Sequence, residues 1–332
     1  MTENAVQQTT PLRREHWIRR VLAVLLVLLG IFLTVIYWLQ PDRLVPITMV
    51  PAWCWLVPVL IGTAIIRNKR VLLILTVWLL FSLLHVEEIR SLARNLRIIE
   101  KQDSVNTSAI QVASLNCNVG MSRVAQEAIM TQSDICLLQE SPGLDSLNKL
   151  LGAEKHDSMA IVWAGDNSII VRGKIEPIMN DIASHFCHVL ATLPDGKKVD
   201  VVSLRLSAPV FRLDFWEAGF WNDHYRKRIH HREQLAEIVN HLKQHQRTEY
   251  LIIGGDFNSV ANDGALTTTL TDFSDSFGDA GAGWGGTGTN GIPVFRVDQI
   301  WSSQNMNCTQ SRAFKTKNSD HRMVISKFLI PE

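Results

Sequence analysis

The chain is poor in cysteine, and its charged residues are missing from long parts of the sequence. Its five cysteines form neither a CxxC pair nor the spacing of a disulfide framework, so they leave the redox compartment open. Residues 21–39, 45–66 and 71–86 contain no Asp, Glu, Lys or Arg, although these types make up 20% of the chain. This distribution excludes a purely soluble protein, a disordered chain and a collagen-like chain. A polytopic transporter of ordinary size is also excluded, because the sequence after about residue 100 reads as water-soluble.

The three uncharged stretches predict about three transmembrane helices, over residues 21–39, 45–66 and 71–86. The first spans roughly 28 Å at about 1.5 Å per residue, close to the thickness of the hydrocarbon core. It is longer than the apolar part of a signal peptide, and no small-residue cleavage site follows it. The second contains three prolines, which membrane helices tolerate. The third is short, so a re-entrant or interfacial segment is the alternative there.

The basic residues around these stretches predict an orientation. Residues 1–20 contain four arginines and the loop 67–70 contains three basic residues, whereas Arg43 is alone in the first loop. The positive-inside rule therefore places residues 1–20 in the cytoplasm. Three crossings predict a multi-pass protein of the cell membrane whose C-terminal domain is extracytoplasmic, in a periplasm. If the third stretch does not cross, the domain lies on the other side.

Residues 87–108 are predicted to be a linker, and residues 109–332 a single domain in which strands and helices mix. Two segments read as helices: Arg123–Thr131, and Ile229–Gln246 with its apolar residues at helical spacing. The predicted strands are Ile110–Leu115, Asp134–Gln139, Asn167–Val171, Lys198–Leu206, Tyr250–Ile253 and Val297–Trp301.

Two further segments of the domain have no clear period. The stretch between Ser207 and Arg228 is rich in aromatic residues and is predicted to be a loop, which would touch a lipid interface or close over the fold's own edge. The basic residues at its end, 226–232, suit a phosphate and equally suit a solvated surface. His241 and His245 lie opposite the apolar stripe of their helix, which predicts a solvated face for them.

Polar side chains follow five apolar strand-like segments at the point where each one ends. Strand ends that converge on one edge of a sandwich would bring these groups into one cleft, although Asp and Asn at a single strand end commonly form turns. The residues are Asn116 and Asn118, Glu140, Asp256 and Asn258, Asp298, and Asp320 with His321.

The sequences and the order of these segments resemble those of the endonuclease/exonuclease/phosphatase superfamily, which includes DNase I-like nucleases, inositol polyphosphate 5-phosphatases and neutral sphingomyelinases. GGDFNS (254–259) and NSDHRMV (318–324) are the specific motifs, and SLNCNVG and DICLLQE support them. The resemblance extends from about Ile110 to Phe328. It implies an α/β (α+β) domain, a four-layer α/β/β/α sandwich of the DNase I-like type, following the membrane helices. It also implies a divalent-metal-dependent phosphoesterase that cleaves a phosphodiester or phosphomonoester by metal-assisted attack of water.

The resemblance further implies a metal site and a catalytic group. Mg²⁺, with Mn²⁺ as an alternative, would be held by Glu140 and Asn116, with Asp320 completing the site. Asp256 would orient or deprotonate the attacking water. His321 would contact the scissile phosphate and be held in its tautomer by Asp298, either as a base or as a charged phosphate ligand.

The substrate-binding residues implied by the motifs are Asn258 and Asn118, and Arg205 departs from the family pattern. Relatives often carry His or Tyr on the strand that precedes the aromatic stretch, whereas this sequence has Arg205. Arginine binds phosphate through two donors, so we expect substrate binding there without a proton donor of suitable pKa. The alternative is that Arg205 marks the end of a strand.

Net charge and the membrane segment limit the substrate class. Residues 101–332 contain 22 Lys+Arg and 26 Asp+Glu, a net charge of −4, which argues against a dedicated binder of duplex DNA. The expected partners are the lipid bilayer and a phosphate ester: nucleic acid, a phospholipid head group or a small phosphoester. No protein partner is implied. A catalytically inactive, membrane-anchored binding module on the same fold is the alternative function.

Overall fold

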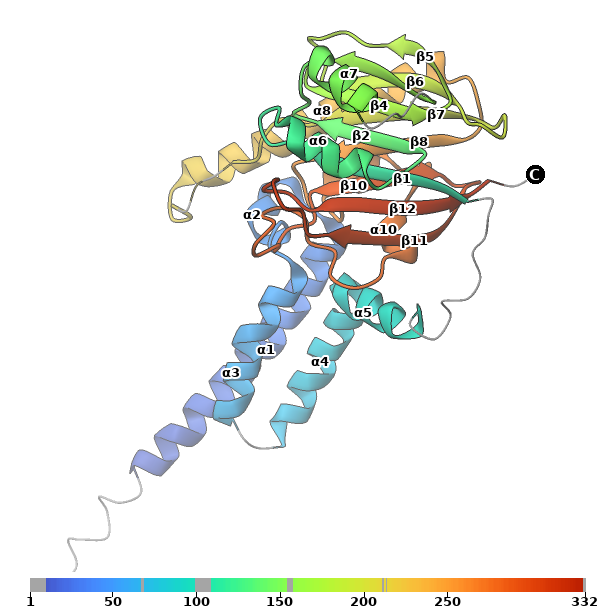
Figure 1. Cartoon of the computed structure of the whole chain (residues 1–332). Coiled ribbons are helices and arrows are strands. Elements are labelled where there is room, and N and C mark those ends of the chain that lie inside the picture. Colours follow the sequence, from blue (N-terminus) through green and yellow to red (C-terminus); the bar gives the residue numbers. More distant parts are fainter. Residues whose placement is uncertain are drawn as a thin grey trace, which may run out of the picture. The chain divides into compact units, whose positions relative to one another are not determined.

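Figure 1 shows the computed structural model of the chain, which describes residues 10–66, 69–98, 109–153, 158–210, 212 and 214–330. The chain forms two compact units, Met1–Ile89 and Arg90–Glu332.

In the first unit, α1 (Thr10–Leu39) packs against α3 (Leu56–Ile66) and α4 (Arg70–His85). Two glycines allow the close approach: a Cβ on Gly30 would lie 2.8 Å from Val77 Cγ1, and one on Gly62 would lie 2.5 Å from Leu26 Cδ1. The indole of Trp78 on α4 also donates a 3.0 Å hydrogen bond to the carbonyl of Leu26. Helix α1 begins well before the predicted residue 21, because the charged residues ahead of the apolar run are also helical.

The prediction of one continuous helix over 45–66 is wrong. The stretch contains α2 (Val45–Thr48), a 3₁₀ turn over Ala52–Trp55 and then α3, preceded by another 3₁₀ turn at Asp42–Leu44. The helical segments on either side of residues 49–51 are bent by 70°. Pro51 explains the break, since proline has no N–H to donate to the preceding turn.

The third stretch forms α4, which stops at His85, and the chain continues after Val86 as α5 (Glu87–Ile98). The segment predicted as a linker therefore contains a helix, and its remaining residues, 99–108, lie outside the described part. Of the helices described, one, over Glu15–Leu39, is long and apolar enough to cross a membrane. The count rises to three if each of the two bent helix pairs is one span.

The second unit contains two six-stranded mixed sheets packed face to face (Figure 1). The first sheet has the order β11-β12-β1-β2-β4-β3 and the second β5-β6-β7-β8-β10-β9. The strands of the first sheet are β1 (Ala109–Asn116), β2 (Ile135–Gln139), β3 (Met159–Ala164), β4 (Asn167–Arg172), β11 (Asn307–Phe314) and β12 (Met323–Leu329). Those of the second are β5 (Lys174–Met179), β6 (Phe186–Thr192), β7 (Lys198–Arg205), β8 (Leu251–Asp256), β9 (Phe273–Asp275) and β10 (Asp298–Ser303).

Three apolar layers hold the sandwich together. Inward-facing residues of both sheets, such as Val112, Val189 and Ile252, form the central core. On the outer face of the first sheet lie α6 (Ser122–Ile129) and α7 (Leu144–Ala153). On the outer face of the second lie α8 (Ala218–His245) and α9 (Gly264–Thr269), and α10 (Ser276–Ala280) packs beside β11. The predicted α/β/β/α sandwich is confirmed.

All six predicted strands are present, with ends displaced by at most a few residues. Helix α8 begins eleven positions before the predicted Ile229, inside the segment predicted to be a loop. Its buried face there carries His224, Arg228 and His231, so an apolar period could not show it. The other strands were not predicted, although β3, β6 and β12 are mainly apolar.

Candidate active site

The second sheet aligns three of the predicted residues at one edge. In the pairing of β8 with β10, Asp256 lies directly opposite Asp298. In the pairing of β7 with β8, the partner of Asp256 is Arg205. Three adjacent strands therefore present a guanidinium and two carboxylates at the same level, and both carboxylates are buried.

A glycine makes this alignment possible. Gly255, just before Asp256, has φ 147°, and a Cβ there would lie 1.9 Å from the carbonyl oxygen of Leu204 on β7. Gly254 faces the other sheet, where a Cβ would lie 2.6 Å from Leu137 Cδ1. The GG of the motif thus lets β8 approach both its neighbouring strand and the opposite sheet.

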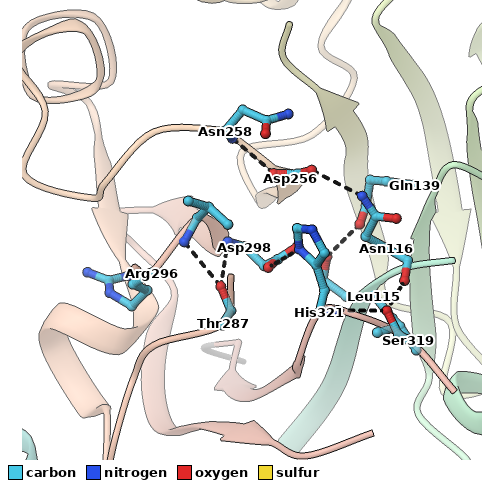
Figure 2. Close-up of polar contacts among 12 residues, drawn as sticks. Leu115, Asn116, Gln139, Asp256, Asn258, Thr287, Arg296, Asp298, Ser319 and His321 are labelled. Carbon is cyan, nitrogen blue, oxygen red and sulfur yellow. Dashed lines mark hydrogen bonds and ion pairs between the residues drawn. The ribbon is translucent and has the colours of Figure 1, made fainter. Parts of the chain in front are cut away.

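The first sheet supplies Asn116 at the end of β1 and Glu140 just after β2. The Nδ2 group of Asn116 donates to Asp256 Oδ2 at 3.1 Å (Figure 2). It also donates to Glu140 Oε1 at 3.2 Å. One buried amide therefore connects carboxylates from the two sheets. Glu140 itself has φ 45°, a conformation that non-glycine residues rarely adopt and that is often found at functional sites.

His321 enters from the loop that precedes β12. Its Nδ1 donates to Asp298 Oδ2 at 2.8 Å, so Asp298 orients the imidazole (Figure 2). Burial of the ring opposes its protonation, but the negative charge of Asp298, this hydrogen bond and the charge of Asp256 outweigh it. Together they raise the pKa of His321 to about 10.

The surroundings of Asp256 disfavour its charged form, whereas those of His321 favour the charged form. Burial, followed by the negative charge of Asp298, raises the pKa of the Asp256 carboxyl above its ordinary value, while His321 and the bonds from Asn258 and Asn116 oppose the rise. The ligand atoms of Asp256, Asp298 and His321 all lie within 4.8 Å of one another. Asp298 Oδ1 is buried and has no hydrogen-bond partner among the residues described.

Arg205 is bonded to carboxylates. Its Nη2 donates to Glu140 Oε1 at 2.7 Å and its Nη1 donates to Asp166 Oδ2 at 3.0 Å, so the guanidinium joins β7 to the β3–β4 turn and to Glu140. The pKa of Glu140 is lowered: burial works against this, and the N–H of Val119, the amide of Asn116 and the charge of Arg205 prevail. Arg205 does more than mark the end of a strand, because it holds the carboxylate predicted to bind metal.

The remaining predicted residues lie around this group. Asn258 is held in place by two hydrogen bonds: its N–H donates to Asp256 Oδ1 at 2.9 Å, and its Nδ2 donates to Leu206 O at 2.8 Å. The N–H of Asn118 donates to Asn116 Oδ1 at 2.9 Å. The side chain of Asp320 is exposed and lies outside the Asp256–Asp298–His321 group.

Several supporting residues were not predicted to belong to the site, although Ser319 and Gln139 lie within the quoted motifs. Thr287 Oγ1 accepts from the N–H of Asp298 at 2.9 Å, and Ser319 Oγ accepts from the N–H of His321 at 2.9 Å (Figure 2). Ser319 also donates to Asn116 O at 2.8 Å, which ties the loop of His321 to β1. Below the site, Gln139 donates to Ser203 Oγ of the opposite sheet at 3.2 Å. A single hydroxyl in a loop has no period or spacing by which it could have been found.

A second polar group lies between α8 and the second sheet. Buried His188 donates from Nε2 to Asp200 Oδ1 at 2.8 Å, and its Nδ1 accepts from His241 Nε2 at 3.1 Å. The prediction of a solvated face is therefore wrong for His241, which is half-buried and bonded to His188, and correct for exposed His245. A cavity of about 950 Å³ lies beside it, lined by residues such as His185 and Glu237 and by none of the strand-end group.

This group predicts an acid-sensitive contribution to stability. Burial, then the neighbouring His188 and His245, lowers the pKa of His241 to about 4, below the ordinary value of about 6.5. The unfolded state therefore binds more protons between these values, and the free energy of unfolding falls as pH falls through that window. We expect His241→Gln to weaken this pH dependence in denaturant titrations of the detergent-solubilised chain. Asn240→Ser, on the same turn, is the control, and an unchanged slope in His241→Gln would contradict the assignment.

Comparison with known proteins gives a consistent result. Residues 113–321 match the Endonuclease/Exonuclease/phosphatase family. A solved endonuclease/exonuclease/phosphatase family protein from Bacteroides thetaiotaomicron is 14% identical, with a TM-score of 0.52 over 68% of this chain and 98% of that one. For the corresponding protein of Bacteroides vulgatus the values are 12%, 0.51, 68% and 100%. For a mannosyl-6-phosphatase from B. thetaiotaomicron they are 15%, 0.50, 67% and 100%. At these identities the structures share a fold, and no curated protein matches significantly.

Proposed function

Because the chain belongs to the endonuclease/exonuclease/phosphatase family, we propose that it is a divalent-metal-dependent phosphoesterase anchored in a membrane. The observation that supports this most is the meeting of Asn116, Glu140, Asp256, Asp298 and His321 at one edge of the sandwich. These residues come from both sheets and from distant parts of the sequence. A phosphate ester resists attack because it is anionic, and such a group of acids, amides and an imidazole suits its hydrolysis.

The donor set fits a hard divalent cation. The carboxylate of Glu140, whose pKa is lowered, lies at the same edge as the amide of Asn116 and the partnerless Oδ1 of buried Asp298, so hard oxygen donors gather there. We propose Mg²⁺, replaceable by Mn²⁺, with Glu140 and Asn116 holding it and Asp320 as a further ligand. When bound, the ion would neutralise charge on the phosphate and polarise its P–O bonds.

The chain's own residues would bind the phosphate and move protons. Asp256 has a carboxyl with a raised pKa, which suits acceptance of a proton from the attacking water. Asp298 accepts the hydrogen bond from His321 Nδ1, so Nε2 is the ring nitrogen left to contact the phosphate. The imidazolium would act there as a charged ligand rather than as a base. Asn258, Asn118 and Arg205 would contact the substrate's phosphate and fix its orientation.

Glu140→Gln tests the metal proposal. The matched control is Glu176→Gln, an exposed carboxylate on β5. We expect Glu140→Gln to weaken Mn²⁺ binding by at least about tenfold, measured by electron paramagnetic resonance on the full chain in detergent. Hydrolysis of bis-p-nitrophenyl phosphate and of p-nitrophenyl phosphate would fall with it, and a chelator would abolish both in wild type. Equal Mn²⁺ affinity and equal rates in Glu140→Gln and wild type would refute the proposal.

A substrate panel of single-stranded DNA, RNA, phosphoinositides, sphingomyelin and sugar phosphates would then identify the ester. Anchoring in a membrane favours substrates that lie at the membrane or in the cell envelope. A C-terminal reporter fusion tests the proposed extracytoplasmic location: alkaline phosphatase should be active there and green fluorescent protein dark.

A further inference from the structure

Helix α5 has one face that is bonded to the sandwich. Arg94 donates four hydrogen bonds of 2.8–3.2 Å to carbonyls at the end of α10 and just beyond it, those of Phe277, Gly278, Asp279 and Gly281. The last carbonyls of a helix have no donor within the helix, so the guanidinium caps α10. Such a set of bonds fixes both the position and the rotation of α5 on the sandwich.

Two neighbours of Arg94 on the same face complete the attachment. The carbonyl of buried Ser91 accepts from the N–H of Gly283 at 3.1 Å. Asn95 Oδ1 accepts from Arg312 Nη2 on β11 at 3.1 Å. Positions 91, 94 and 95 lie on one side of a helix, so this face is committed to the sandwich.

Another face of α5 is apolar and exposed. Ile89, Leu92 and Leu96 have 40%, 47% and 70% of their surface exposed, and their spacing puts them in one line along the helix. We call these three residues the α5 stripe. Exposed Arg90 follows Ile89 in the chain, and two carboxylates, Glu87 and Glu88, stand in the first turn of the helix. A line of large exposed apolar side chains on a helix that also carries charged residues is typical of helices that lie at a membrane interface.

The chain itself indicates what covers the stripe. Helix α5 begins two residues after the end of α4, the last of the apolar helices. The pair formed by α4 and α5 can be a single bent span or a span followed by another element. The bonds from Ser91, Arg94 and Asn95 to the sandwich decide against the first, since a hydrocarbon core does not admit such polar surface.

We propose that α5 is an interfacial helix whose stripe lies among the lipid head groups and thereby holds the sandwich at the bilayer surface. This inference rests on the membrane anchoring in the proposed function. The occupant is the lipid bilayer, because the stripe directly follows the proposed membrane helix α4. The sandwich is then kept close to substrates that are part of the membrane.

Lipid quenching of fluorescence tests the proposal on the full chain in vesicles of phosphatidylcholine and phosphatidylglycerol. A fluorescent amino acid is placed at Leu92 or Leu96, at Leu28 in α1 as a mid-span control, and at Lys174 on β5 as a water-exposed control. We expect a shallow doxyl lipid to reduce emission at positions 92 and 96 more than a deep one does. At position 28 the deep doxyl lipid should quench more than the shallow one, and at position 174 neither lipid should reduce the emission.

Each other result has a definite meaning. Unquenched positions 92 and 96 with a quenched position 28 would overturn the interfacial helix and leave the anchor intact, as would protection of the stripe by a second copy of the chain. Deep quenching at 92 and 96 would overturn it in favour of a continued span. Loss of quenching at position 28 would overturn the anchoring as well, whereas the metal and activity measurements on Glu140→Gln stand independently of all these outcomes.

Discussion

Replacing His321 with alanine is expected to lower kcat/KM for bis-p-nitrophenyl phosphate by about 10²–10⁴-fold, the range for removal of one acid–base or charge-stabilising group. The imidazole is held by Asp298 at 2.8 Å and lies beside Asp256. Its removal takes away the proposed phosphate ligand and the cation that is bonded to Asp298 and lies beside Asp256. Most of the loss should appear in kcat, because the ligand acts on charge that develops as the ester is cleaved.

The control for this variant is His230→Ala, which removes an exposed imidazole from α8. Circular dichroism and the melting temperature of both variants establish that they fold. Asp298→Asn is the companion variant: it keeps the size of the side chain but loses the charge that fixes the ring, so its activity should lie between wild type and His321→Ala. A folded His321→Ala chain with wild-type kcat would remove His321 from the mechanism.

The second large effect is on stability. Arg228→Met is expected to lower the free energy of unfolding by about 3–5 kcal/mol, because it leaves a buried carboxylate without its partner. Arg228 and Asp263 are 2% and 4% exposed, and the guanidinium donates to Asp263 Oδ2 from Nε at 3.1 Å and from Nη2 at 2.9 Å. The same aspartate caps α9 through a 2.7 Å bond from the N–H of Ala265. The pair therefore joins α8 to the segment that follows the reactive end of β8.

Denaturant titration of the full chain in detergent measures this effect. Arg226→Met, two residues earlier on the exposed side of the same helix, should change the free energy of unfolding by less than about 0.5 kcal/mol. Adding Asp263→Ser to Arg228→Met removes the orphaned charge but keeps a capping oxygen, so the double variant should recover part of the loss. A loss below about 1 kcal/mol in Arg228→Met would mean that water or another group compensates Asp263.

Much of the site could be predicted because its residues follow apolar strands within recognisable motifs. Asn116, Glu140, Asp256, Asp298 and His321 all occupy strand ends or the loop just before a strand. Sheet geometry then brings such positions to a shared edge. Their detailed partners could not be predicted, since the bond from Arg205 to Glu140 joins strands of different sheets.

The fold was less predictable where burial and polarity disagree. The first half of α8 buries His224, Arg228 and His231, which reads in the sequence as a basic surface. The break in the second apolar stretch depends on how Pro51 is accommodated, and composition does not determine this. Helix α5 was not predicted either, because its many polar residues, among them the Ser91, Arg94 and Asn95 that bond to the sandwich, made the segment read as a linker.

The amide of Asn116 has a consequence for how the two halves of the sandwich work together. It donates to Glu140 on one sheet and to Asp256 on the other, so one planar group fixes the distance between these two carboxylates. A substitution that slides the sheets, such as one at the contact of Gly254 with Leu137, changes the bond to Asp256 while the bond to Glu140, within the first sheet, remains. We therefore expect such a substitution to lower the rate of ester hydrolysis more than it lowers the melting temperature.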